Sequence, residues 1–229
     1  MARELALRSD TQVVGVAGRH RHPPTVGFVP PISVNSLPIG GPVLYESWLR
    51  LGWPKVESVV DNADLVHSTT IIAPATSLPL VVTIHDLAFL RHPDFFTARG
   101  NKVFRRSLDI IRDKAAMVLC SSQATLEDCQ TAGIYADRLR LVPLGVRSQT
   151  ITDADRARVR ATYDLPERFV LFVGTLEPRK NLARLIAALD SIRGAPPLVV
   201  VGMAGWGDHT PSTAYDVRFT GFVPAHNLP

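Results

Sequence analysis

The sequence predicts an α/β fold made of two parallel-sheet domains, the second of them truncated. Short apolar runs alternate with stretches of helical periodicity, which is the pattern of repeated strand and helix units. Runs such as LVVTI and RFVLFVG are continuous and rich in Val, Ile and Leu, as expected of strands in a sheet that is covered on both faces and is therefore parallel. A polar, charged segment that begins at Gly145 separates two such series and places a domain boundary near residue 148.

Strands are predicted where Val, Ile and Leu cluster between turn residues, because these side chains suit a buried, pleated surface. Before the polar segment the predicted strands are Val13–Ala17, Asp64–Ser68, Leu80–His85, Ala116–Cys120 and Leu139–Pro143. After it they are Arg168–Val173, Pro197–Gly202 and Val217–Gly221.

Helices are predicted where apolar residues recur at every third or fourth position. They are Ala2–Arg8, Pro42–Leu51, Pro54–Asn62, Ala98–Lys114, Gln123–Ala132, Asp153–Tyr163 and Asn181–Ile192. The acids Asp153 and Asp155 stand at the start of one helix, where negative charge is favourable to the helix dipole. This D-A-D sequence is therefore interpreted as a helix start and not as a metal site.

The predicted elements divide the chain into three parts. Residues 1–147 form a first domain that lacks its first strand, residues 148–165 a linker and helix, and residues 166–229 part of a second domain. A doubly wound domain normally begins with its central strand and a glycine-rich turn, whereas this sequence opens on a short amphipathic helix. We therefore expect the sequence to be a fragment of a longer protein.

The composition excludes several classes of protein. The chain has 229 residues, 46% of them hydrophobic, but no run that is long enough to cross a membrane and no signal peptide. With two cysteines, Cys120 and Cys129, a disulfide framework is excluded and a cytoplasmic protein with reduced thiols is expected. The net charge of +4 comes without the dense basic stripe and interleaved aromatic residues of nucleic-acid-binding proteins.

The stretch VGTLEPRKN contains the strongest candidate for a binding site. A predicted strand ends at Gly174 and a helix follows, so Arg179 and Lys180 stand where the N–H groups of a helix start disfavour positive charge. A phosphate or diphosphate between the cations and the backbone would remove this conflict. From the residues alone, a solvated pair at a surface turn is an equal alternative.

Several motifs, in order along the chain, resemble those of glycosyltransferase family 4. They are VVTIHDLAFLRHPDFF, VLCSSQATLEDC, RLRLVPLGV, LFVGTLEPRKNLARLIAAL, LVVVGMAGWGD and RFTGFVPAHNLP, and the likeness covers most of Asp64–Pro229. The resemblance implies the GT-B fold, in which two Rossmann-like domains face each other across a cleft. It also implies transfer of a sugar from a nucleotide diphosphate donor with retention of configuration, usually without a metal.

The resemblance assigns the cation pair to the donor diphosphate. Lys180 and Arg179, with the strand end at Gly174 and Thr175, would bind the diphosphate and stabilise the charge on the leaving group. Many family members have arginine where this chain has Thr175. Lys180 is therefore the stronger assignment of the two cations.

Two further motifs acquire roles in the same way. From the residues alone, His85 in TIHDL is more often a loop histidine, because nothing in the motif completes a catalytic group. The resemblance places His85 at the donor sugar as the catalytic candidate. Asp86 is interpreted as an Asx-type turn residue, with a partner that fixes the imidazole as the alternative. Gly202 and Gly205, in VVVGMAGWGD, would line the nucleotide pocket.

The expected substrates follow from the resemblance. The donor is a GDP- or UDP-sugar, with mannose among the candidates, and the acceptor is a cell-envelope glycan or a lipid-linked molecule, with no cofactor, no metal and no nucleic acid. One basic helix is either a solvated surface or a peripheral contact with anionic lipid at the inner face of the cell membrane. Its cations are Arg99, Lys102, Arg105, Arg106, Arg112 and Lys114.

Two other functions remain open. The family carries a later E-x₇-E segment with no equivalent in this sequence, so a non-catalytic remnant, inactive by itself, is one alternative. A dinucleotide-binding oxidoreductase is the other, although Gly202, Gly205 and Gly207 do not have the spacing G-x-G-x-x-G that such enzymes require.

Overall fold

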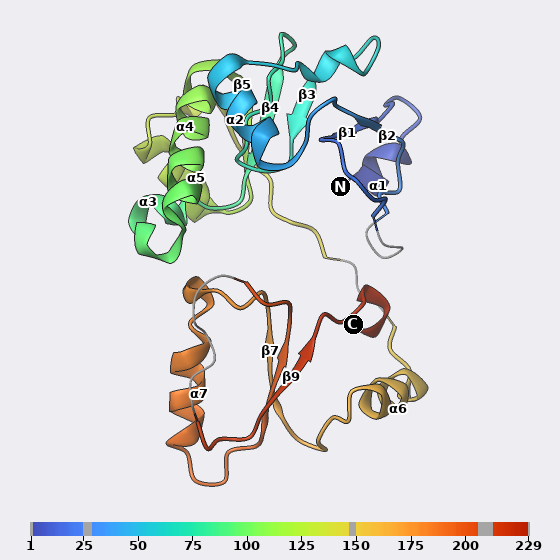
Figure 1. Cartoon of the computed structure of the whole chain (residues 1–229), viewed down its shortest axis with the longest axis vertical. Helices are drawn as coiled ribbons and strands as arrows, with labels where there is room; N and C mark the ends of the chain where they lie inside the picture. Colours follow the sequence, from blue (N-terminus) through green and yellow to red (C-terminus); the bar gives the residue numbers. More distant parts are fainter. Residues whose placement is uncertain (1, 25–28, 147–149, 206–212, 229) are drawn as a thin grey trace. The chain divides into compact units, whose positions relative to one another are not determined.

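The computed structural model describes residues 2–24, 29–146, 150–205 and 213–228. The chain divides into two compact units, Met1–Gly145 and Val146–Pro229, which we call the first and the second unit (Figure 1). Both units contain parallel sheets with flanking helices, so the predicted fold class is confirmed.

The main sheet of the first unit consists of parallel strands in the order β3-β4-β5-β6. The strands are β3 (Val66–Ser68), β4 (Leu80–Ile84), β5 (Ala115–Cys120) and β6 (Leu139–Leu141). In β4, which has a neighbour on each side, Leu80, Val82 and Ile84 are buried. An uncharged run suits this position because its backbone bonds to a strand on each side and this face is buried.

The helices of the first unit are α1 (Ala2–Ala6), α2 (Gly41–Leu51), α3 (Ala88–Arg91), α4 (Ala98–Lys114) and α5 (Gln123–Thr131), with the 3-10 turns η2 (Val56–Ser58), η3 (Pro93–Phe95) and η4 (Ala136–Arg138). The hydroxyl of Thr97 accepts a hydrogen bond from the Gly100 N–H at 3.0 Å, and α4 begins there. Ser122 caps α5 in the same way, through the Thr125 N–H at 3.1 Å. These caps satisfy N–H groups that have no partner inside the helix.

The core of the first unit lies between the main sheet and its helices. Val82, Ile84 and Val118 of the sheet and Ile111 of α4 have no exposed surface and belong to one cluster. This is the burial that the apolar runs and the helical spacing predict.

Ser107 is a polar residue inside this core, and its hydroxyl has two hydrogen-bond partners. The Ser107 hydroxyl donates to the Ile71 carbonyl at 2.6 Å and accepts from the Ala73 N–H at 2.7 Å. Cys120 and Cys129 are both buried and unbridged. The Cys120 thiol and burial together raise the pKa of Cys129, so this thiol stays protonated.

A second parallel pair lies beside the main sheet (Figure 1). It consists of β1 (Gly15–Ala17), which the sequence predicts, and β2 (Val34–Ser36), which it does not. The sequence of β2, VNS, is short and mostly polar, and all of its side chains are exposed. A strand of three residues with exposed side chains leaves no apolar pattern to detect.

The predicted helix Pro54–Asn62 is wrong. The structure has the 3-10 turn η2 in this region, followed by further turns. The Val56 N–H donates to the Ala75 carbonyl at 2.9 Å, and the Glu57 carboxylate accepts from the Ser77 N–H at 2.6 Å. These bonds to a distant segment compete with helical bonds, and valine favours the helix little.

The sheet of the second unit has parallel strands in the order β7-β8-β9. Its elements are α6 (Asp153–Thr162), β7 (Val170–Val173), η5 (Pro178–Lys180), α7 (Leu182–Asp190), β8 (Leu198–Val201), β9 (Val217–Gly221) and η6 (Ala225–Asn227). Ile186 of α7 packs against Leu198 and Val200 of β8 on one face of the sheet. Val199 and Val201 pack on the other face in a separate cluster, so β8 is covered on both faces.

The outer strand β7 is covered less completely. Leu171 and Val173 are 54% and 55% exposed, whereas the alternate positions of the strand are partly buried. Two of the four side chains of an apolar strand therefore face solvent in the described part of the unit.

Candidate functional site

Glycines lie next to one another at the carboxyl ends of the strands in the second unit. The Gly174 N–H donates to the Val201 carbonyl and the Gly202 N–H to the Gly221 carbonyl, both at 2.9 Å. Their φ angles, +156° at Gly174, +152° at Gly202 and +71° at Gly221, are values that other residues rarely adopt. The backbone is therefore bare along this edge, which is where open α/β sheets bind ligands.

Gly202 and Gly205 are also required by close backbone packing. A Cβ atom on Gly202 would lie 2.0 Å from the Gly174 carbonyl oxygen, and one on Gly205 would lie 2.1 Å from that of Leu176. The Leu176 N–H donates to the Met203 carbonyl at 3.1 Å, so the turns after β7 and β8 continue side by side. The predicted role of these glycines at a nucleotide remains a prediction, and the structure adds a packing role that sequence reasoning missed.

Lys180 lies over the end of β7. Its Cε atom is 3.7 Å from the position that a Cβ on Gly174 would take. Arg179 and Lys180 belong to η5, and Asn181, with φ of +52°, separates this turn from the first residue of α7, Leu182. The cations thus precede the helix on a turn of their own, and do not open the helix as the sequence suggests.

Arg179 has a protein partner. Its guanidinium donates to the Glu177 carboxylate at 3.0 Å, and Glu177 is only 7% exposed. A buried carboxylate requires a paired cation, because an unpaired buried charge is costly. Glu177 therefore supplies the negative charge beside Arg179 that the sequence analysis assigned to a bound phosphate. In the sequence, this ion pair is indicated only by the position of Glu177 two residues before Arg179.

In the first unit, His85 is exposed just beyond the carboxyl end of β4. Its Nε2 atom is 3.2 Å from the Thr69 carbonyl oxygen, and its own carbonyl accepts from the Thr125 hydroxyl at 2.8 Å. The Asp86 carboxylate accepts from the Ala88 N–H at 3.0 Å, which is the Asx turn that the sequence predicts. The backbone of His85 is therefore fixed while its ring faces solvent.

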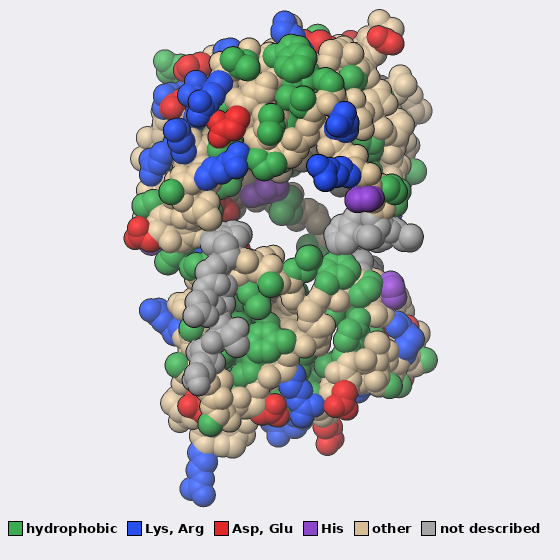
Figure 2. All heavy atoms as spheres, viewed as in Figure 1, with side chains coloured by type: hydrophobic (Ala, Val, Ile, Leu, Met, Phe, Trp, Pro, Cys, Tyr) green, Lys and Arg blue, Asp and Glu red, His purple; other side chains and the backbone are tan. Residues whose placement is uncertain are grey.

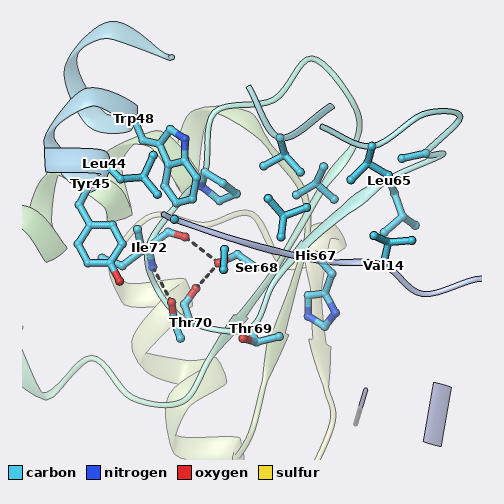
Figure 3. Close-up of a pocket in the computed structure, with 18 of the residues that line it drawn as sticks. Val14, Leu44, Tyr45, Trp48, Leu65, His67, Ser68, Thr69, Thr70 and Ile72 are labelled. Carbon is cyan, nitrogen blue, oxygen red and sulfur yellow. Dashed lines mark hydrogen bonds between the residues drawn. The ribbon is translucent and has the colours of Figure 1, made fainter. Parts of the chain in front are cut away.

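A cavity of about 390 Å³ reaches this region of the first unit (Figure 3). It extends from apolar side chains of β1, α2 and β3 to the threonines that follow β3. The residues labelled in Figure 3 are Val14, Leu44, Tyr45, Trp48, Leu65, His67, Ser68, Thr69, Thr70 and Ile72. No motif marked this cavity in the sequence, because its walls come from three separate segments.

His67, on β3, is one of the polar residues that line this cavity, together with Ser68 and the threonines that follow it. Its Nε2 atom is 2.8 Å from the Thr83 hydroxyl oxygen on the neighbouring strand. Burial lowers the pKa of His67, so its ring is neutral near pH 7. The neutral ring shares one hydrogen bond with Thr83 and adds no charge to the cavity.

Among the described residues, some cations of the basic helix α4 form hydrogen bonds or ion pairs with other residues, and others do not. Figure 2 shows basic side chains gathered on the side of the first unit where Figure 1 draws α4. Arg106 donates to the Leu49 carbonyl at 2.8 Å, and Arg112 to the Asp109 carboxylate at 2.8 Å. Arg106 and Arg112 of this helix are therefore already hydrogen-bonded within the protein. Contact of the helix with anionic lipid remains a prediction.

The acidic D-A-D sequence has the structural role that was predicted for it. The Thr152 hydroxyl accepts from the Asp155 N–H at 3.2 Å, and the Asp155 carboxylate accepts from the Thr152 N–H at 3.1 Å, which caps α6. Within the described ranges, no group of three His, Cys, Asp or Glu side chains could hold a metal ion. No helix in those ranges has the length and apolar character to cross a membrane.

The sequence model of Glycosyltransferase Family 4 matches residues 1–150. O-antigen chain mannosyltransferase B of Escherichia coli is 27% identical over 206 residues, which cover 82% of this chain and 54% of that protein. D-inositol 3-phosphate glycosyltransferase of Acidothermus cellulolyticus is 27% identical over 234 aligned residues, which cover 88% and 52%. The chain thus spans about half the length of the curated relatives it matches.

Solved structures of similar fold include Anabaena HepE. The crystal structure of HepE in complex with UDP-glucose matches with a TM-score of 0.58 and 19% identity, covering 86% of this chain and 58% of that one. The complex of HepE with UDP and glucose gives a TM-score of 0.57 and 20% identity, with 85% and 57% covered. At this identity the similarity concerns the fold.

Proposed function

Because the chain belongs to glycosyltransferase family 4, we propose that it forms part of an enzyme that transfers a sugar from a nucleotide diphosphate donor, with retention of configuration. Two curated relatives are named a mannosyltransferase and a glycosyltransferase acting on inositol 3-phosphate, and HepE has been crystallised with UDP and UDP-glucose. The UDP bound to HepE supports a nucleotide-sugar donor, which we propose is a GDP- or UDP-sugar, and the mannosyltransferase name supports mannose as a candidate sugar.

The single observation that carries the proposal is the position of Lys180 over the bare backbone at Gly174. An ammonium group on a flexible stem, next to an edge without side chains, allows a diphosphate to approach both the lysine and the backbone N–H groups. Arg179 is already paired with Glu177, so we assign the main diphosphate contact to Lys180. The lysine then stabilises the negative charge that develops on the departing nucleotide.

We assign His85 to contact with the donor sugar. Its backbone is held by hydrogen bonds while its ring stays exposed, which suits a residue that must meet a substrate in one orientation. For the acceptor we propose a cell-envelope glycan or a lipid-linked molecule, in keeping with the O-antigen and inositol phosphate named for the relatives.

The structure weakens the case for a dinucleotide-binding oxidoreductase. The glycines that suggested it, Gly202 and Gly205, are explained by backbone packing against Gly174 and Leu176. Their irregular spacing follows from the two turns that they bring together, and needs no pyrophosphate loop.

Calorimetry with UDP, GDP and NAD on residues 1–229 tests the proposal. We expect Lys180→Ala to weaken binding of the preferred nucleoside diphosphate roughly 10- to 100-fold, the value of one charged hydrogen bond. Arg184→Ala, which removes an exposed cation from α7, is the matched control and should leave affinity unchanged. Equal affinity of the wild type and Lys180→Ala, or binding of NAD alone, would refute the assignment.

A further inference from the structure

Glu177 is the only residue with a charged side chain that is buried in the described part of the chain. Charged side chains are almost never buried unless they are paired, and Glu177 is paired with Arg179. A neutral residue here would avoid the cost of taking a carboxylate out of water. Packing alone therefore does not account for a carboxylate at this position.

Glu177 holds the turn η5 through both its backbone and its side chain. Its carbonyl accepts from the Lys180 N–H at 3.0 Å, and its carboxylate accepts from the Arg179 guanidinium at 3.0 Å. The residue before it, Leu176, is itself fixed, because its N–H donates to the Met203 carbonyl at 3.1 Å. Glu177 thus connects both cations of the turn to the carboxyl edge of the sheet.

The side chain of Lys180 is directed from this turn. Its Cε and Cδ atoms lie 3.7 and 3.8 Å from the position that a Cβ on Gly174 would take. Among the residues that the structure describes, none forms a hydrogen bond or an ion pair with the Lys180 ammonium. Because no protein group holds the far end of this side chain, the turn at its base sets where the ammonium lies.

The charges of the turn allow two roles of Glu177 to be told apart. The pair of Glu177 and Arg179 has no net charge, so Lys180 supplies the net positive charge of the turn. If Glu177 acted only as a charge, Glu177→Gln would leave Arg179 unbalanced and would strengthen the binding of an anion. If Glu177 fixes the turn, the same change would weaken that binding.

We propose that Glu177 is a positioning residue for Lys180, which fixes η5 through its ion pair with Arg179 so that the ammonium lies over Gly174 at the donor diphosphate. This role of Glu177 rests on the proposed function, since it concerns the diphosphate contact of Lys180. A glutamine holds the guanidinium by a weaker, uncharged acceptor, so the turn loosens and Lys180 must be ordered when the ligand binds. Ordering one long side chain corresponds to a loss of about 2- to 12-fold in affinity.

Calorimetry with UDP and GDP on the protein of 229 residues tests the proposal, with the nucleotide that binds more tightly as the probe. We expect Glu177→Gln to weaken binding about 2- to 12-fold. In the Lys180→Ala background the same substitution should have no effect, because a residue that acts through the lysine loses its role with it. Glu167→Gln is the matched control: it removes the same charge at an exposed position before the amino end of β7, and affinity should not change.

Weaker binding that disappears in the Lys180→Ala background supports the proposal. Unchanged or tighter binding by Glu177→Gln, with Lys180→Ala alone still weakening it, overturns this role of Glu177 and leaves the proposed function in place. If Lys180→Ala alone has no effect, the proposed function fails and the role of Glu177 fails with it.

Arg179→Gln is a second variant, which removes the cation of the same pair and serves if Glu177→Gln does not fold. Amide hydrogen exchange in β8 shows whether the second unit of each variant is folded. Weaker binding by Arg179→Gln only while Lys180 is present supports the proposal. An equal loss in the Lys180→Ala background means that Arg179 contacts the diphosphate itself, and overturns it.

Discussion

Gly202→Ala tests the backbone packing that underlies the candidate site. The new Cβ would lie 2.0 Å from the Gly174 carbonyl oxygen, an atom fixed in place by β7. The backbone at φ of +152° costs a non-glycine residue about 1–3 kcal/mol, and relief of such an overlap costs about 1–3 kcal/mol more. We therefore expect the second unit to lose roughly 2–6 kcal/mol of stability.

Gly194→Ala is the matched control for this change. Gly194 has φ of +75°, and within the described part of the chain a Cβ there would meet open space. The control therefore carries the conformational cost alone, about 1–2 kcal/mol. The difference between the two variants reports the overlap between the turns after β7 and β8, together with the difference in backbone cost between φ of +152° and +75°.

The free energies are best measured by native-state hydrogen exchange of the β8 amides, because a melt of the whole chain combines two units. If Gly202→Ala costs no more than Gly194→Ala, within about 0.5 kcal/mol, then the two turns do not pack as described. Backbone packing would then not explain why glycine stands at position 202.

Two further predictions concern the first unit. Ser107→Ala leaves a buried main-chain donor and a buried acceptor without partners, so urea unfolding should show a loss of roughly 2–4 kcal/mol; a loss below about 0.5 kcal/mol, the range of ordinary surface changes, would contradict the buried bonds. Burial lowers the pKa of His67 in the folded state, so the unfolded chain binds the proton more readily. The free energy of unfolding should therefore be highest above about pH 6.5, the ordinary pKa of histidine, and should fall as the pH drops below it. Between pH 7.5 and 5.5, His67→Gln should reduce this loss of stability, whereas His22→Gln, at an exposed loop position, should not. Identical pH profiles of stability for the wild type and His67→Gln would contradict the prediction.

The parts of the fold that could be predicted are those where local pattern and burial agree. The uncharged run of β4 and the helical spacing of α4 each indicate one structure, and tertiary packing reinforces it. The segment Pro54–Asn62 was mispredicted because Glu57 bonds to a turn twenty residues away in sequence. No local pattern reports such a bond.

The sequence predicted where the candidate site lies on the sheet, but it did not predict which side chains pair with one another there. The strand end and the cation pair were visible in the sequence, as was the carboxyl edge on which they lie. The pairing of Arg179 with Glu177 depends on the burial of the carboxylate, and the cavity depends on three segments meeting in space. Both are properties of the folded chain.

The exposed apolar side chains of β7 favour self-association of the chain of 229 residues at high protein concentration. β7 is the outer strand of its sheet in the described part of the unit, and its sequence, VLFV, is uncharged and strongly β-forming. Pairing of such edges between molecules is second order in protein, whereas folding is first order. Dilution therefore preserves the monomer, and a lysine in place of Leu171 would act as a gatekeeper that permits higher concentrations.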